Sequence, residues 1–199
     1  MHPFFLRSHV RPVSVMTVLA LALVGCASDP KPPEKKNLSP EQITQQRQAI
    51  DDVAQAAMTR LYQEYPEAQA KVEQAAGYGV FSVGMVNAVL LVEATGNGVI
   101  VDQKNGQRTY MQEARAGTGP GLGYQRLTQV FIFKSESALN QFKINDAAGA
   151  DISASATLGT SNHGMSFSPN IEAYQMNEKG FALQANWGGT AYFVDPDLN

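Results

Sequence analysis

The apolar positions of residues 39–65 repeat with the spacing of an α-helix. Ser39 is a good N-cap, Pro40 suits the first helical position, and Gln42 completes a capping-box pattern. The apolar stripe that follows is Ile43, Ile50, Val53, Ala54, Ala57, Met58, Leu61 and Tyr65. Because the residue before a proline avoids helical geometry, Tyr65-Pro66 ends this helix, and a second short helix runs to about residue 75. The small residues in the stripe favour packing on a sheet over lying on a membrane.

After Gly77 the pattern changes to short apolar runs separated by turn residues. The runs with strand character are residues 78–83, 88–94, 98–103, 107–114, 124–133, 151–158, 170–176, 181–187 and 190–194. Lys104–Gly106 and Asn177–Gly180 are typical of hairpin turns, and Ser135 caps a short helix near residues 136–142. Helices followed by closely spaced strands predict an α+β fold, with N-terminal helices packed on an antiparallel, barrel-like β-sheet.

The first 25 residues have the pattern of a signal peptide. Arg7 and Arg11 form a positive region, and the apolar stretch Val13–Gly25 has 13 residues. A bilayer core needs about 20 apolar residues, so this stretch is too short to span one. It ends at Leu23-Val24-Gly25-Cys26, which resembles the lipobox of bacterial lipoproteins, and Cys26 is the single cysteine of the chain. We therefore expect Cys26 to carry the acyl chains of a membrane anchor, palmitate among them.

Residues 26–38 are expected to join this anchor to the domain. The segment from Ala27 to Leu38 has three prolines and no apolar periodicity, which is typical of an extended, solvated tether. In lipoproteins of this kind an Asp after the Cys tends to hold the protein at the inner membrane. The Ala27 found here favours the outer membrane, with the domain facing the periplasm or the cell surface. The domains are then 1–25, 26–38 and 39–199.

Charge and the chemically reactive residues argue against several classes of function. The formal net charge is −3, and it becomes −5 without residues 1–25, so the footprint of a nucleic-acid-binding protein is missing. His163 is the single His after residue 25, and Ser82 lacks the glycine spacing of a nucleophile elbow. The pairs Asp51/Asp52 and Asp195/Asp197 are most simply solvated, and no cluster has metal-ligand spacing. We expect no catalytic residues, no metal site and no cofactor.

The segment "GTGPGLG", Gly117–Gly123, resembles a phosphate-binding loop but fails its chemistry. Such a loop needs backbone N–H groups at a helix N-terminus, whereas Pro120 lacks its N–H and a strand-like run follows. No Gly-Lys pair follows, and Leu122 stands where the dinucleotide motif requires Gly. The glycines predict a tightly bent strand instead of a nucleotide site.

Four segments in order resemble the SYLF domain, the family that includes yeast actin-binding proteins with an SH3 domain. They are Ala75–Val83, Gly96–Gln107, Gly119–Phe142 and Ala173–Asn199, the last of which is similar to the final hairpin of that family. The resemblance implies a non-enzymatic domain linked to lipid binding, with phosphoinositide and actin binding in eukaryotic members. A periplasmic protein meets no actin, so lipid binding is the family property that we expect for this chain.

The sequence thus predicts a lipid-anchored envelope protein whose SYLF-like domain binds lipid, with a phospholipid as the candidate ligand. Arg47, Arg60 and Lys71 on the predicted helices are the candidate lipid contacts, although Asp51, Asp52 and Glu64 offset the positive charge of the first helix. The alternative is a structural or stress-related envelope protein that binds another protein through its sheet face. An enzyme is the third possibility, and the oligomeric state is left open.

Overall fold

The computed structural model describes residues 32–144, 165–184 and 187–199. Two helices come first, α1 (Pro40–Glu64) and α2 (Glu67–Glu73), followed by the strands β1 (Gly77–Asp102) and β2 (Arg108–Phe133). Helix α3 (Glu136–Ile144) precedes β3 (Met165–Ser168), β4 (Ile171–Gln184) and β5 (Trp187–Val194). The α+β class predicted from the sequence is confirmed. Within the described residues no helix is both long and apolar enough to cross a membrane.

Helix α1 begins and ends where its sequence signals place it. The Ser39 hydroxyl accepts from the Gln42 backbone N–H at 3.3 Å, and the Gln42 side chain accepts from the Ser39 N–H at 2.8 Å. This reciprocal capping box satisfies two backbone donors that a helix start leaves without partners. At the other end the Tyr65 N–H bonds to the Leu61 carbonyl, and the chain breaks before α2.

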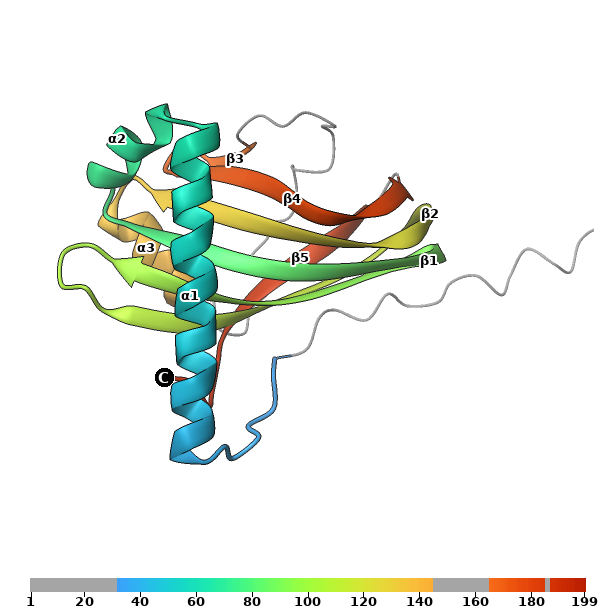
Figure 1. The fold of residues 1–199 in the computed structure, drawn as a ribbon, viewed down its shortest axis with the longest axis horizontal. Helices are drawn as coiled ribbons and strands as arrows, with labels where there is room; N and C mark the ends of the chain where they lie inside the picture. Colours follow the sequence, from blue (N-terminus) through green and yellow to red (C-terminus); the bar gives the residue numbers. More distant parts are fainter. Residues whose placement is uncertain (1–31, 145–164, 185–186) are drawn as a thin grey trace, which may run out of the picture.

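Strands β1 and β2 form one long antiparallel hairpin that is folded in half. They pair from Gly77 opposite Phe133 to Val101 opposite Arg108, around the tight turn that follows Asp102. Figure 1 shows both strands running away from the helices, turning at the far end and coming back. The turning point is a register shift between Val89 and Leu91, opposite residues 118–121. The glycine-rich segment is therefore part of a bent strand, as predicted, and Pro120 lies in the irregular stretch, where a missing N–H breaks no ladder.

The remaining strands extend this hairpin into an open sheet. The order is β1-β2-β4-β3, and β5 pairs with β2 beyond the end of β4. Gly121 faces Gln184 and Thr118 faces Trp187, so β4 and β5 follow β2 one after the other in the same direction. The sequence interpretation was wrong in two respects here. Asn177–Gly180 continues β4 with a bulge and does not turn, and the expected final hairpin is absent because β4 and β5 both pair with β2.

The runs predicted as separate strands also merge. Three of them form β1 and two form β2, because the breaks between them are bends within a continuous ladder. The two halves of β1 approach closely at Gly98, where an added Cβ would lie 2.4 Å from the Val80 carbonyl oxygen. Only a residue without a side chain allows that approach. The predicted strand at 151–158 lies outside the described residues.

Two hydrophobic clusters hold the layers together. In one, both halves of the hairpin and β5 pack with Leu139 and Phe142 of α3. In the other, α1 and α2 pack on the strands through Ala54, Ala57, Met58, Leu61, Ala68 and Val72. In Figure 1 α1 crosses the strands at the end opposite the bend. The prediction that the apolar stripe of α1 packs on the sheet is confirmed.

The C-terminal residues connect the tether, α1 and the sheet. The Asp195 carboxylate accepts from the backbone N–H groups of Asp197 and Leu198 and from Gln112. The Asp197 carboxylate accepts from the backbone N–H groups of Lys36 and Asn37 at 2.7 and 3.1 Å. These two acids are therefore structural, and the expectation of a simple solvated pair was wrong.

The two members of the other acidic pair, Asp51 and Asp52, have different roles. Asp51 accepts from Arg108 and from the Tyr110 hydroxyl, both at 3.1 Å, so it ties α1 to β2. Asp52 is exposed and bonds to Gln48 on the same helix. The solvated interpretation therefore fails for Asp51.

Candidate lipid-contact site

Large apolar side chains are exposed where the β1–β2 hairpin bends. Val86 is opposite Tyr124 in the register and Ala88 is opposite Leu122, so these residues share one face of the sheet. The exposed fractions in this group run from 48% to 64%. We name as the apolar tip the five residues Val86, Val89, Leu91, Leu122 and Tyr124. Exposed apolar groups gathered in this way mark sites of contact with a membrane, a ligand or another protein.

The backbone at the apolar tip is strained. Val89 has a φ of 62°, in the left-handed region, which a β-branched residue rarely adopts. The strain coincides with the register shift and with a side chain that is exposed instead of packed. Strained, exposed positions of this kind cluster at functional sites, so the bend is a candidate site in its own right.

A groove lies beside helix α1, on the side toward the apolar tip. Its volume is about 770 Å³, and it lies between α1, the tether and the outer face of β1 and β2. Its lining includes Ile50, Val53 and Ala54 from α1, Gly84 and Arg126 from the strands, and Lys36 from the tether. Gly84 and Arg126 are opposite each other in the register, two positions from the Val86–Tyr124 pair. The groove and the apolar tip are therefore adjacent surfaces.

A second polar feature borders the groove, where the buried Glu113 is part of the lining. Glu113 is 1% exposed, and its carboxylate approaches Arg115 at 3.9 Å without a hydrogen-bond partner among the described residues. The neighbouring Tyr192 hydroxyl donates to Gln129 at 3.1 Å, and Arg115 donates to the Thr190 hydroxyl at 2.8 Å. Burial raises the pKa of Glu113 to about 7 against the partial compensation from Arg115.

Arg47 and Arg60, two of the candidate lipid contacts, lie on α1 and hold it to other parts of the domain. Arg47 donates to the Leu198 carbonyl at 2.9 Å and lies over the Tyr110 ring. Arg60 pairs with Glu64 on its own helix and donates to the Asn177 carbonyl on β4. Both side chains are engaged within the protein, and neither lines the groove. Their role as lipid contacts stays a prediction.

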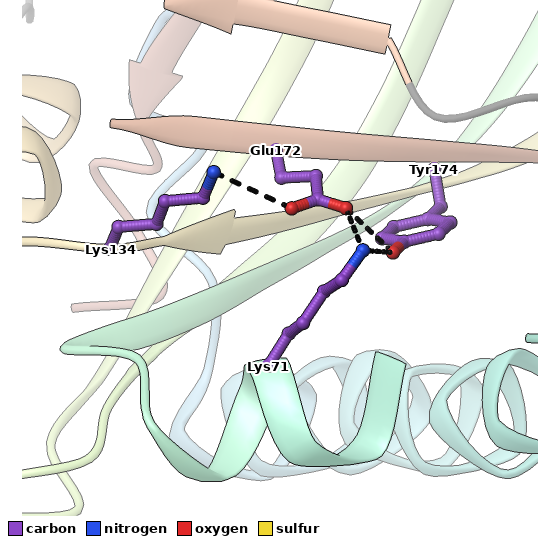
Figure 2. Close-up of polar contacts among 4 residues, drawn as sticks. All are labelled: Lys71, Lys134, Glu172 and Tyr174. Atoms are coloured by element: carbon purple, nitrogen blue, oxygen red, sulfur yellow. Dashed lines mark hydrogen bonds and ion pairs between the residues drawn. The ribbon is translucent and has the colours of Figure 1, made fainter. Parts of the chain in front are cut away.

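Lys71, the third candidate, belongs to a polar cluster between α2 and β4. Figure 2 shows its ammonium group against the Glu172 carboxylate and the Tyr174 hydroxyl, with Lys134 on the other side of Glu172. The bond to Glu172, and then that to Tyr174, raises the pKa of Lys71 above its ordinary range. Burial opposes ionisation of Glu172, yet the bonds from Lys71 and Tyr174 hold the pKa of that carboxyl below its ordinary value. The cluster joins α2 to the sheet as a charged pair.

Cys26, the predicted site of lipid attachment, lies outside the described residues, and so does His163. Ser82 lines the groove and has no basic side chain bonded to it within the described ranges. In the same ranges, no three His, Cys, Asp or Glu side chains are grouped to hold a metal ion.

Sequence reasoning missed the apolar tip because an apolar run in a strand ordinarily predicts burial. The available signal was the glycine-rich segment, which marked a bend but not which apolar neighbours the bend would expose. The groove was missed as well, since it depends on residues far apart in the chain.

Comparison with known proteins gives one relative of note. No family model matches the chain. The chain is similar to a protein named Beta cell expansion factor A from Aeromonas veronii, with 31% identity over 162 residues. The match covers 81% of this chain and 62% of that protein, so this chain spans about three fifths of the length of its relative.

Proposed function

We propose that this protein is a lipoprotein, anchored to the outer membrane through Cys26, whose SYLF-like domain binds lipid without enzymatic activity and faces the periplasm. The observation that carries the proposal is the apolar tip. Five large apolar side chains stand exposed at the end of a bent hairpin, at a point of backbone strain. The resemblance of four ordered segments to the SYLF domain supports the same class of ligand.

A bilayer suits this surface for a physical reason. Fully burying a Val or Leu side chain contributes about 1.5–3 kcal/mol, and the tip side chains already hide part of their area, so each can add a fraction of that. Insertion of apolar side chains into a bilayer requires no specific hydrogen-bond partners, and none of the five tip residues is charged. We expect the tip to contribute a weak affinity that does not depend on anionic lipid.

The anchor and the tip would act together. A single weak hydrophobic attachment gives only marginal, reversible membrane binding, and two together hold firmly. Once Cys26 is acylated, the tether keeps the domain near the bilayer, so a weak tip affinity becomes an effective one. Arg47, Arg60 and Lys71 are secondary candidates for contact with headgroups in this arrangement.

The test uses the full-length chain with Cys26→Ser. Cells supplied with labelled palmitate should label the wild-type chain and leave the Cys26→Ser chain unlabelled. The same Cys26→Ser substitution in residues 26–199, which lack the apolar stretch of the predicted signal peptide, then isolates the affinity of the domain itself. This shorter chain should co-sediment with phosphatidylcholine vesicles, and Leu91→Ser with Leu122→Ser should reduce the bound fraction severalfold, because two exposed apolar groups are lost.

Val53→Ser is the matched control, because Val53 is also an exposed apolar residue but lies on α1, outside the tip. This variant should sediment like its parent. If the tip variant binds vesicles as well as its parent does, the proposed lipid contact is wrong, and the alternative of a protein partner at the sheet face gains support.

A further inference from the structure

The groove beside the apolar tip owes its depth to small residues. Ser82, Gly84, Gly96 and Ala114 line its floor, and the apolar side chains of α1 line one wall. Val53 on this wall stays 41% exposed, although it belongs to the apolar stripe of the helix. The floor and wall leave a space of about 770 Å³, within the range of pockets that hold small ligands.

The exposed charged side chains that line the groove are both positive. Arg126 lies at the end near the tip, and Lys36 reaches the groove from the tether. Neither side chain takes part in an ion pair among the described residues. Glu113 is the one acid in the lining, and its side chain is fully buried. The groove therefore combines an apolar wall with free positive charge, which is complementary to an anionic amphiphile.

The backbone of the tether is fixed over the groove. The backbone N–H groups of Lys36 and Asn37 donate to the Asp197 carboxylate. These bonds position Lys36 through its backbone and do not involve its ammonium group. Arg126 is exposed, and its guanidinium group carries five N–H donors. A guanidinium in this situation matches one carboxylate group through two parallel hydrogen bonds.

We propose that this groove binds a single-chain, long-chain carboxylate, with the aliphatic tail along α1 and the carboxylate at Arg126. A diacyl phospholipid is larger than the drug-sized ligands that pockets of this volume enclose. The inference rests on the proposed lipid-binding function for the class of ligand. It concerns a different surface from the apolar tip, so the two can fail separately.

Gly84 allows the groove to be filled without disturbing the sheet. A Cβ added at Gly84 would meet only ordinary contacts, the nearest being the Tyr124 hydroxyl at 3.6 Å. At Gly96, also in the lining, an added Cβ would lie 2.6 Å from the Ser82 carbonyl oxygen and would force the strands apart. Gly84→Val is therefore the variant to use, and its thermal melt should match that of its parent.

The experiment titrates residues 26–199 with Cys26→Ser, the chain without its predicted signal peptide, with dansylaminoundecanoate below its micelle concentration. The parent should bind one probe molecule with increased fluorescence. Gly84→Val should weaken binding at least about tenfold, and Arg126→Gln should weaken it by about tenfold through the lost charged contact. Lys104→Gln removes a cation far from the groove, in the turn between β1 and β2, and should bind like the parent.

Competition identifies the head group. Dodecanoate should displace the probe, and dodecanol should displace it much more weakly. Unchanged binding in Gly84→Val, or equal displacement by dodecanol, would overturn the proposal. The tip variant Leu91→Ser/Leu122→Ser should keep its probe affinity. If the tip variant loses vesicle binding but still binds the probe, the bilayer contact and the carboxylate site are on two different surfaces. If the tip variant also loses the probe, the carboxylate binds at the tip and not in the groove.

Discussion

Glu113 shows what a single residue can do to the stability of this fold. Its carboxylate is buried in β2, and the Arg115 side chain lies 3.9 Å away. Burial raises the pKa of Glu113 to about 7 in the folded state, against the ordinary 4.5 expected when the chain unfolds. The folded protein therefore retains a proton that the unfolded chain loses between these two values.

The consequence is a loss of stability as the pH rises. The contribution of the protonated carboxyl is fully present below about pH 4.5 and is lost as the pH rises to 7. The shift corresponds to about 3 kcal/mol. We expect Glu113→Gln, which cannot ionise, to be more stable than wild type at about pH 8 and to show a flatter profile of unfolding free energy. Urea titrations across this range measure it, and parallel profiles for the two chains would contradict the assignment.

At the scale of elements, local signals determined what could be predicted. The cap at Ser39, the break at Tyr65-Pro66 and the cap at Ser135 act within a few residues, and all three were predicted correctly. The strands were divided wrongly because a bend in a ladder and a turn between strands use the same glycine and proline residues. Only the pairing of β1 with β2 distinguishes them, and pairing is a property of distant residues.

Gly98 provides a test of the folded hairpin. An added methyl group would overlap the Val80 carbonyl and the Phe81 ring, so Gly98→Ala should cost about 1–3 kcal/mol. Gly84→Ala, also on β1, has room for its methyl group and should leave stability almost unchanged. Thermal unfolding of both variants measures the difference. Equal stabilities would mean that the two halves of β1 do not approach as described.

At the scale of the whole molecule, the helices and the C-terminus gather at one end and the apolar tip projects at the other (Figure 1). The proposed anchor at Cys26 rests on a contiguous sequence motif and lies outside the described residues, so it stays a prediction. The candidate site could not be predicted from sequence, since an apolar run in a strand predicts burial unless the bend that exposes it is known. The three basic residues chosen from the sequence lie on the helices, and Arg47, Arg60 and Lys71 each bond within the domain.

The central claim is that the apolar tip enters the bilayer, and an environment-sensitive dye tests it most directly. Cys26 is the one cysteine in the chain, so Cys26→Ser combined with Leu91→Cys carries a single dye at the tip. The matched control combines Cys26→Ser with Lys104→Cys, at the turn between β1 and β2. With phosphatidylcholine vesicles, the tip dye should shift to the blue and be quenched by brominated lipid tails, whereas the control dye should not respond. A tip dye that stays in water while the chain sediments with vesicles would contradict the account.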